Sequence, residues 1–383
     1  MPNASPSHRI YLDANATTRP FPEVVETVAR HLASTTGNPG SRHADGRQAR
    51  RVLEAAREKI ADLLGADPSE VVFTSGGTEA NNLAILGRTQ GPTGTVAVTD
   101  GEHPATLETT RALVQRGWRL ETLPINADGR LHSHATQTLE ATSDLRLVTM
   151  LLANNETGVI QDVEPLAQWC RDRGVPLFVD AVQAVGKMPL NFHQMGVSLL
   201  SLGAHKFHGP RGVGALLVRD GVKLAPLTLG GHQEVGRRPG TESVALIAGM
   251  ATALEHCLQH LVERTTLLNQ LRDRLQSRLA AECSPVVING SIEHRLPNTL
   301  NIAFPGVDGE ALLVALDLEG ISCSLGSACA SGSAEPSPVL LAMNCPPEVY
   351  RSSVRFSVST DNTLDEIDEA CRRIARVVQR LRK

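Results

Sequence analysis

The stretch Leu202-Gly203-Ala204-His205-Lys206-Phe207-His208-Gly209-Pro210 directly follows an apolar run over residues 197–202. A strand that ends in such a turn places a lysine amine at the mouth of a sheet. A single lysine there is most often a solvated surface cation. The alternative is a lysine that forms a Schiff base with a carbonyl cofactor. The surrounding sequence has to distinguish these two roles.

Short apolar runs alternate with helical patterns on both sides of this stretch. Helical patterns cover residues 22–34, 44–64, 79–88 and 163–173, and the apolar runs that predict strands are 71–74, 95–98, 145–153, 176–180, 197–202 and 212–218. Alternation of this kind predicts an α/β fold with a mostly parallel central sheet and helices on both faces. Ligands of such sheets bind at the carboxyl ends of the strands.

The alternation stops near residue 245. A long helical pattern over 243–279 is followed by predicted strands at 285–288, 298–303 and 354–358 and by predicted helices at 310–318 and 364–381. This pattern predicts a second, smaller α+β domain. We expect an N-terminal arm over residues 1–20 that associates with the small domain, a large domain over 21–258 and a small domain over 259–383.

Composition excludes several classes of function. The 383 residues are 41% hydrophobic and 20% charged, with a net charge of −4, so neither nucleic acid nor a membrane is an expected partner. The apolar run 244–254 is too short to span a bilayer, and residues 1–5 carry no signal pattern, so we expect a cytoplasmic protein. Seven cysteines without a Cys-x-x-Cys pair predict free thiols and no metal site.

The first strand end with residues suited to ligand binding is Thr74-Ser75-Gly76-Gly77-Thr78-Glu79-Ala80. Gly77, the Thr78 hydroxyl and the helix N-terminus form an anion site that suits a phosphate. The alternative is an ordinary tight strand-to-helix turn. The sequence contains neither a P-loop nor a dinucleotide fingerprint.

Three further strand ends carry polar side chains. Asp180, with Gln183 behind it, is either a helix cap or the partner of a pyridinium nitrogen. His103 is either a surface residue or an imidazole that stacks on a flat ring or transfers protons. Asn155 follows a fourth strand and supplies donors to a ring substituent or to a substrate carboxylate. These strand ends, together with Lys206, indicate a phosphorylated aldehyde cofactor.

Two residues of the second half complete the set. Arg355, on a predicted strand, is either solvated or a bidentate clamp for an amino-acid carboxylate across an interdomain cleft. Cys329 lies in a stretch of small residues, 324–334, that cannot form a core, so its thiol suits a nucleophile on a mobile loop. Cys323 ends an apolar segment and is expected to pack.

At this point the sequence resembles the cysteine desulfurases of the NifS/IscS type, which are fold-type I pyridoxal phosphate enzymes of the class V aminotransferase family. The resemblance extends from Tyr11-Leu12-Asp13 to Arg355-Phe356-Ser357. Its motifs are Gly37-Asn38-Pro39, Thr74 to Glu79, Glu102-His103, Asn154-Asn155-Glu156-Thr157-Gly158, Asp180-Ala181-Val182-Gln183-Ala184-Val185-Gly186-Lys187, His205-Lys206, Arg238-Pro239-Gly240-Thr241-Glu242 and Gly326-Ser327-Ala328-Cys329.

The resemblance implies a homodimeric enzyme that converts L-cysteine to L-alanine and transfers the sulfur to an acceptor protein, such as an iron–sulfur scaffold. Lys206 would carry pyridoxal 5'-phosphate as a Schiff base and move protons, and Cys329 would receive the sulfur as a persulfide. Asp180 would contact the pyridinium nitrogen, Gln183 and Asn155 would contact ring substituents, and His103 would stack on the ring. The phosphate would be bound by Gly77, Thr78, His205 and the partner subunit's Thr241. The substrate would be bound by Asn155 and Arg355.

The sequence also departs from this family. Glycine stands at position 203, where relatives often have a serine whose hydroxyl helps to bind the phosphate. His232 and Val235 replace a glycine and an arginine near the site entrance, and the chain ends without the longer tail of members that dock a scaffold. The rival functions are a selenocysteine lyase or aminotransferase of the same fold, and a non-catalytic sulfur-relay subunit.

Overall fold

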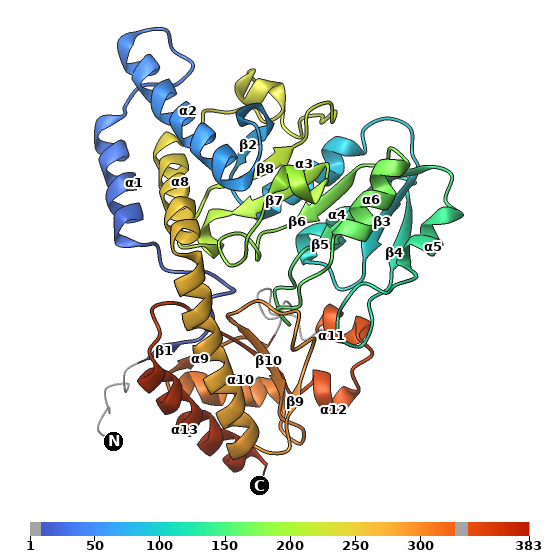
Figure 1. The fold of residues 1–383 in the computed structure, drawn as a ribbon, viewed down its shortest axis with the longest axis vertical. Coiled ribbons are helices and arrows are strands. Elements are labelled where there is room, and N and C mark those ends of the chain that lie inside the picture. Colours follow the sequence, from blue (N-terminus) through green and yellow to red (C-terminus); the bar gives the residue numbers. More distant parts are fainter. Residues whose placement is uncertain (1–8, 326–335, 383) are drawn as a thin grey trace.

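The computed structural model describes residues 9–325 and 336–382 (Figure 1). Its largest element is a seven-stranded sheet in the order β2-β8-β7-β6-β5-β3-β4. The strands in that order are β2 (Val71–Thr74), β8 (Gly214–Val218), β7 (Leu199–Gly203), β6 (Leu177–Asp180), β5 (Leu145–Leu151), β3 (Thr95–Thr99) and β4 (Arg119–Leu123). Only β8 runs antiparallel to its neighbours. The predicted mostly parallel sheet is therefore confirmed.

Helices cover both faces of this sheet (Figure 1). They are α1 (Pro22–Ser34), α2 (Ala44–Leu64), α3 (Gly77–Arg88), α4 (Pro104–Val114), α5 (Ala135–Glu140), α6 (Glu164–Asp172), α7 (Phe192–Met195) and α8 (Val244–Gln259), with short turns η1 (Pro68–Glu70), η2 (Ala204–Lys206) and η3 (Gln233–Gly236). Successive strand residues enter opposite hydrophobic clusters, as Phe178 and Val179 do. The strands are apolar on both faces for this reason.

Two sequence predictions need correction. The polar edge strand β4, with the sequence Arg-Leu-Glu-Thr-Leu, was not predicted because its side chains are mostly not buried. The single helical segment expected over 243–279 is two helices, α8 and α9 (Leu261–Glu282), which meet at His260. Their separate packing explains the break, because α8 packs on α1 and α2 whereas α9 packs on α13 (Leu364–Leu381).

A second hydrophobic cluster lies beneath the large sheet, around an antiparallel sheet of order β12-β10-β9 (Figure 1). The elements here are β9 (Val287–Ile288), β10 (Thr299–Ala303), α10 (Gly309–Leu318) and β12 (Ser353–Ser357), while α11 (Pro338–Ala342) and α12 (Pro347–Tyr350) contribute to a separate small cluster with Ile125. The N-terminal β1 (Ile10–Tyr11) pairs in parallel with β11 (Ile321–Ser322). The exact division into domains stays a prediction.

Within residues 9–325 and 336–382, no helix combines the length and the apolarity that a membrane span needs.

Candidate active site

Lys206 lies at the end of η2, directly after β7. Its Nζ donates to the backbone carbonyl oxygens of Asn15 and, at 2.9 Å, Ala16, which belong to the N-terminal arm. Burial and, to a smaller extent, the positive charge of Arg355 lower the pKa of Lys206 to about 8, against the opposing charges of Asp13 and Asp180. A lysine with this pKa is partly neutral near neutral pH and can attack a carbonyl group. Because they shift its pKa, the side chains of Arg355, Asp13 and Asp180 belong to the same site as Lys206.

Asp180 ends β6 and is buried. Its Oδ1 accepts from the backbone N–H of Val182 at 2.9 Å, and its Oδ2 accepts from Asn81 Nδ2 at 2.6 Å. Sequence reasoning missed Asn81. A signal was available, because Asn81 follows Thr78 by three residues and therefore shares its face of α3.

His103 is the N-cap of α4, and its Nδ1 accepts from the backbone N–H of Ala105 at 3.0 Å. The ring proton is therefore on Nε2. Burial lowers the pKa of His103, which keeps the imidazole neutral. Burial likewise raises the pKa of the adjacent Glu102 to about 8, and Thr99 Oγ1 donates to its Oε1 at 2.6 Å.

The predicted anion site lies where α3 begins beside the end of β7. Gly76 has a φ of 156°, and α3 starts at Gly77 with Thr78 as its second residue. A Cβ atom on Gly203 would lie 3.3 Å from the backbone nitrogen of Gly77, and one on Gly214 would lie 2.8 Å from the Gly76 backbone. Because Gly203 and Gly214 have no Cβ atoms, space remains for an anion next to the first backbone N–H groups of α3; we call this space the cradle.

His205 and Thr241, the other two residues predicted to contact the phosphate, differ in their surroundings. His205 Nδ1 lies 3.2 Å from Thr17 Oγ1, and burial, reinforced by Lys206, lowers the pKa of His205 to about 4. Thr241 is exposed, in the segment that precedes α8. That segment is attached to the first turn of α3 by an ion pair of 2.8 Å between Arg238 Nε and Glu79 Oε1.

Arg355 approaches from the small sheet, on β12, and is buried. Its Nη2 lies 2.6 Å from Asp13 Oδ1, and its Nη1 donates to the backbone carbonyl of Asn155 at 3.1 Å. Its Nε is buried and has no hydrogen-bond partner among the described residues. Arg355 therefore keeps a donor for a further anion. The side chain of Asn155 itself makes none of these contacts.

Cys329 lies outside the described residues, so its predicted position has no structural account. The last described residues before that region lie beside Arg355, because the backbone N–H of Arg355 donates to the Ser324 carbonyl at 2.7 Å. Cys323, which was expected to pack, lies against the second hydrophobic cluster, around the β12-β10-β9 sheet. Burial raises the pKa of its thiol.

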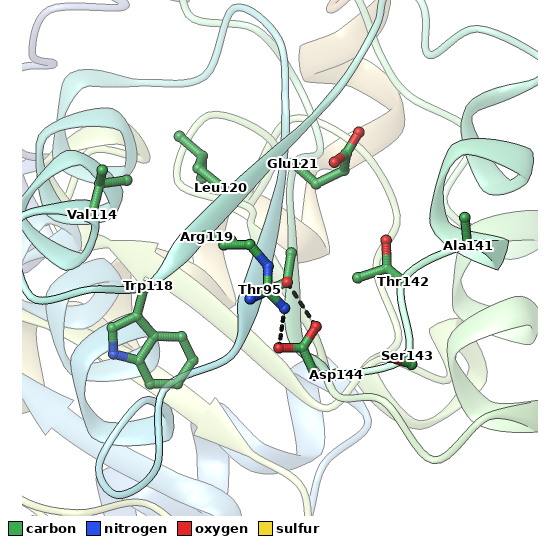
Figure 2. Close-up of a pocket in the computed structure, with 10 residues that line it drawn as sticks. All are labelled: Thr95, Val114, Trp118, Arg119, Leu120, Glu121, Ala141, Thr142, Ser143 and Asp144. Carbon is green, nitrogen blue, oxygen red and sulfur yellow. Dashed lines mark hydrogen bonds and ion pairs between the residues drawn. The ribbon is translucent and has the colours of Figure 1, made fainter.

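A surface hollow lies away from this site, at the opposite ends of the strands (Figure 2). It is lined by residues at the starts of β3 and β4 and by the loop before β5. Two of its charged groups pair with each other, since Arg119 lies against Asp144, and Asp144 also accepts from Thr95 Oγ1 at 3.0 Å. Glu121 also lines the hollow, but no second unpaired charged side chain of the lining converges with it on a ligand.

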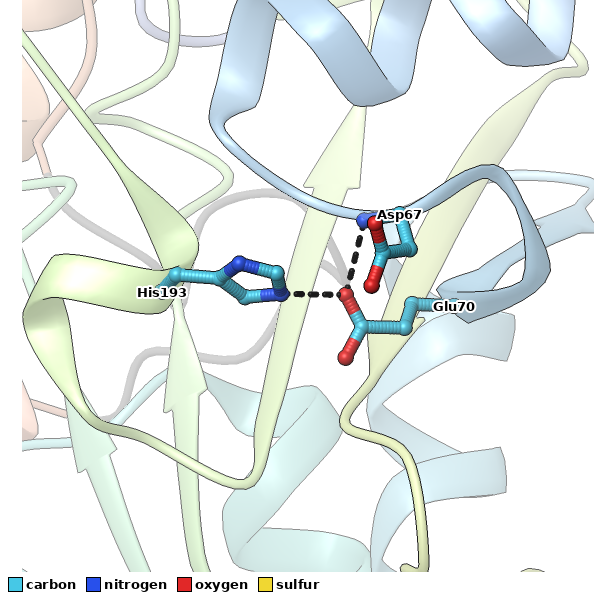
Figure 3. Close-up of side chains that lie close together, drawn as sticks. All are labelled: Asp67, Glu70 and His193. Carbon is cyan, nitrogen blue, oxygen red and sulfur yellow. Dashed lines mark hydrogen bonds and ion pairs between the residues drawn. The ribbon is translucent and has the colours of Figure 1, made fainter.

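Asp67, Glu70 and His193 form a small group of metal-ligating residue types (Figure 3). Glu70 Oε2 is already engaged by the Asp67 backbone N–H at 2.8 Å and by His193 Nε2 at 2.7 Å, and its Oε1 accepts from the Asp220 N–H at 3.0 Å. These contacts fasten η1 to α7 and to the end of β8. We assign the group a structural role.

The described residues fit a phosphorylated, positively ionisable ring aldehyde. A cradle of helix N–H groups suits the phosphate, the lysine of lowered pKa suits the aldehyde, and the buried Asp180 suits a ring nitrogen. The unpartnered Nε of Arg355 suits the carboxylate of an amino acid bound beside it.

Comparison with known proteins gives a consistent result. A sequence model of the family described as Aminotransferase class-V matches residues 10–370. A cysteine desulfurase of Trichormus azollae is 44% identical over 97% of this chain and 94% of its own length. The cysteine desulfurase NifS of Azotobacter vinelandii is 42% identical over 97% and 93%, respectively. A solved NifS-like protein superposes with a TM-score of 0.91 at 35% identity, covering 97% of this chain and 100% of the other.

Proposed function

The chain belongs to the class V aminotransferase family, as a cysteine desulfurase of the NifS/IscS type, and on this premise we propose which of its residues carry the reaction. The fold of a NifS-like protein over nearly the whole chain agrees with this activity. One observation supports the proposal most strongly. The half-buried Lys206 has a pKa lowered to about 8 by burial and by Arg355, while Asp13 and Asp180 act in the opposite direction.

We infer that pyridoxal 5'-phosphate is held at the carboxyl edge of the sheet, as a Schiff base on Lys206. Asp180 would bind the ring nitrogen, held in place by its two hydrogen bonds from Val182 and Asn81. The N–H groups at Gly77 and Thr78 would hold the phosphate, together with His205. His103 would stack on the ring through its neutral imidazole, and Gln183 and Asn155 would contact ring substituents.

When bound, this cofactor withdraws electrons and makes the α-proton of an amino acid removable. Arg355 binds and orients the cysteine carboxylate through donors that it does not share with Asp13 or Asn155. Lys206, once its amine is free and neutral, removes the α-proton and returns it to the substrate. His103 keeps its Nε2 proton beside these groups and excludes water from one face of the site.

Sulfur transfer needs a second nucleophile, for which we propose Cys329. Its thiolate attacks the substrate sulfur, so that an S–S bond forms while the Cβ–S bond of cysteine breaks. The electron pair of that bond stays on Cβ, which takes up a proton and leaves as part of alanine. The product on the protein is a persulfide, which an acceptor protein then receives. An iron–sulfur scaffold is one such acceptor.

We further propose that the enzyme is a homodimer in which Thr241 of one protomer completes the phosphate site of the other. Two features support this arrangement. Thr241 is exposed, and the neighbouring segment carries two apolar side chains, Leu229 and Val235, that are 92% and 82% exposed. The expected cytoplasmic location stays a prediction.

The test is a pair of assays on purified protein with L-cysteine, which measure alanine and, after addition of a reductant, sulfide. We expect the wild-type protein to be yellow and to form both products, and Cys329→Ala to lose sulfide release. Undiminished sulfide release by Cys329→Ala would refute the persulfide role.

The alternatives predict other outcomes. A transaminase would convert several amino acids to their keto acids without any requirement for Cys329. A selenocysteine lyase would prefer selenocysteine to cysteine by a wide margin. A non-catalytic relay subunit would form no alanine at all.

A further inference from the structure

Lys187 is a buried lysine for which the proposed reaction has no role. It is 5% exposed and lies in the turn after β6, four residues beyond Gln183. Its Nζ donates to Gln183 Oε1 at 2.8 Å and to Asn15 Oδ1 at 3.4 Å. Among the described residues, no carboxylate pairs with it. A buried amine without an anion is costly to keep unless it has a use.

Its hydrogen bonds match a neutral amine. An ammonium group has three N–H donors, whereas a neutral amine has two, and the described residues offer two acceptors. Burial pulls the pKa of Lys187 well below its ordinary value, and the positive charges of Lys206, Arg355 and Arg264 act in the same direction. The two acceptors and the direction of this pKa shift both favour the neutral amine, whose role is to donate hydrogen bonds.

The bond to Gln183 determines which way the Gln183 amide faces. Gln183 Nε2 donates to the backbone carbonyl of Asn15 at 2.9 Å, which is the same oxygen that accepts from Lys206 Nζ. If the amide turned over, its Oε1 would face this carbonyl oxygen, and two acceptors would repel each other. It would also lose its donor from Lys187. The Asn15 carbonyl and Lys187 thus act from opposite sides of the amide, and Lys187 supplies the donor that holds Oε1 away from the site.

We propose that Lys187 is a positioning residue of the cofactor site, which fixes the Gln183 amide and, through Asn15, the carbonyl that receives the Lys206 amine. Gln183 then presents an N–H donor to a ring substituent, and the arm keeps its place beside Lys206. This inference rests on the proposed cofactor site. It assigns a specific task to a residue that does not itself touch the substrate or the cofactor.

The experiment compares Lys187→Met with the wild-type protein by titrating the cofactor-free form of each with pyridoxal 5'-phosphate. Loss of the amide orientation is worth about one hydrogen bond, so we expect a dissociation constant about tenfold higher and a shifted visible absorbance maximum. Urea unfolding of the cofactor-free proteins is the second readout. We expect similar midpoints, because the methionine removes a buried amine and Asn15 Oδ1 still accepts from Asn298 Nδ2 at 2.9 Å. The control is Lys223→Met, at an exposed lysine, which should match the wild type in both measurements.

A double-mutant cycle then tests whether Lys187 acts through Gln183. If it does, Lys187→Met combined with Gln183→Met should bind the cofactor no more weakly than Gln183→Met alone. Additive losses would overturn the proposal, as would a dissociation constant for Lys187→Met within twofold of wild type. A Lys187→Met protein that fails to fold would identify a purely structural lysine and would also overturn it. Failure of the wild-type protein to bind the cofactor would instead refute the proposed function.

Discussion

Replacing Arg355 by lysine should raise the KM for L-cysteine by about 10- to 150-fold and change kcat much less, because one charged hydrogen bond to the substrate is lost. In the free protein, one Nη1 donor is bound to the Asn155 carbonyl and one Nη2 donor to Asp13. The Nε donor has no partner. We expect a substrate carboxylate to bind along the edge formed by Nε and Nη2 through two parallel bonds.

The magnitude follows from this donor count. Lysine keeps the positive charge but is a point donor, so it can supply one of the two bonds to the carboxylate. A hydrogen bond to a charged group contributes about 1.5–3 kcal/mol. At about 1.4 kcal/mol for each factor of ten, this loss corresponds to about 10- to 150-fold in binding.

The assay is steady-state alanine formation with L-cysteine and with its methyl ester, which lacks the negative charge. The wild-type enzyme should discriminate strongly between acid and ester, whereas Arg355→Lys should discriminate weakly. The control is Arg351→Lys, an exposed position four residues away. Equal discrimination by both proteins, or an unchanged KM, would refute the assignment of Arg355 to the substrate carboxylate.

Three further predictions follow from the same structure. Gly203→Ser should lower the dissociation constant of pyridoxal 5'-phosphate, because the backbone at Gly203 is extended with φ −133° and a Cβ there lies 3.3 Å from the Gly77 nitrogen, where a hydroxyl can reach the phosphate. The rate constant for cofactor uptake by the cofactor-free protein should rise with pH and level off above about 8, because the amine of Lys206 must be neutral to attack an aldehyde and its pKa is about 8. Val235→Gly should raise the free energy of unfolding of the single protomer, measured at a protein concentration at which no dimer forms, by about 1 kcal/mol, because Val235 has a left-handed φ of 56° and an 82% exposed side chain.

Each of these predictions has a contradicting result. For Gly203→Ser, an equal or larger dissociation constant would show that the added side chain obstructs the cradle. An uptake rate that keeps rising up to pH 10 would indicate an unperturbed lysine. The control for Val235→Gly is Val262→Gly on α9, also exposed, which should lower stability by about 0.4 kcal/mol because glycine is a poorer helix former than valine. A decrease for both would exclude strain at Val235.

The sequence was most informative where one physical constraint acts locally. Strands of a parallel sheet that is covered on both faces are continuous apolar runs, so β5 and β6 could be predicted from composition alone. Polar residues just after such runs, including Asp180 and Lys206, then had to lie at one edge of the sheet. The edge strand β4 was not predicted, because a strand whose side chains are mostly not buried has no apolar run.

The partners of the site residues could not be predicted in the same way. Asn15 bonds to residues 140 and 284 positions away, and such pairings depend on how separate elements dock. The left-handed backbone conformation of Glu234 could not be predicted from the sequence either. It is held by the buried carboxylate of Glu234, which accepts from Arg57 Nη2 at 2.7 Å and from the Phe73 N–H at 2.9 Å.

The attachment of the N-terminal arm has a consequence for biosynthesis. Asn15 and Ala16, which receive the Lys206 amine, are synthesised long before the segment around Ser357 that holds them. The backbone N–H of Asn15 donates to Ser357 Oγ, 342 residues later, and β1 pairs with β11. Closing so long a loop has to wait for the distant segment. A nascent chain therefore exposes an incomplete lysine site until Ser357 has been synthesised, so cofactor loading is expected only after that point.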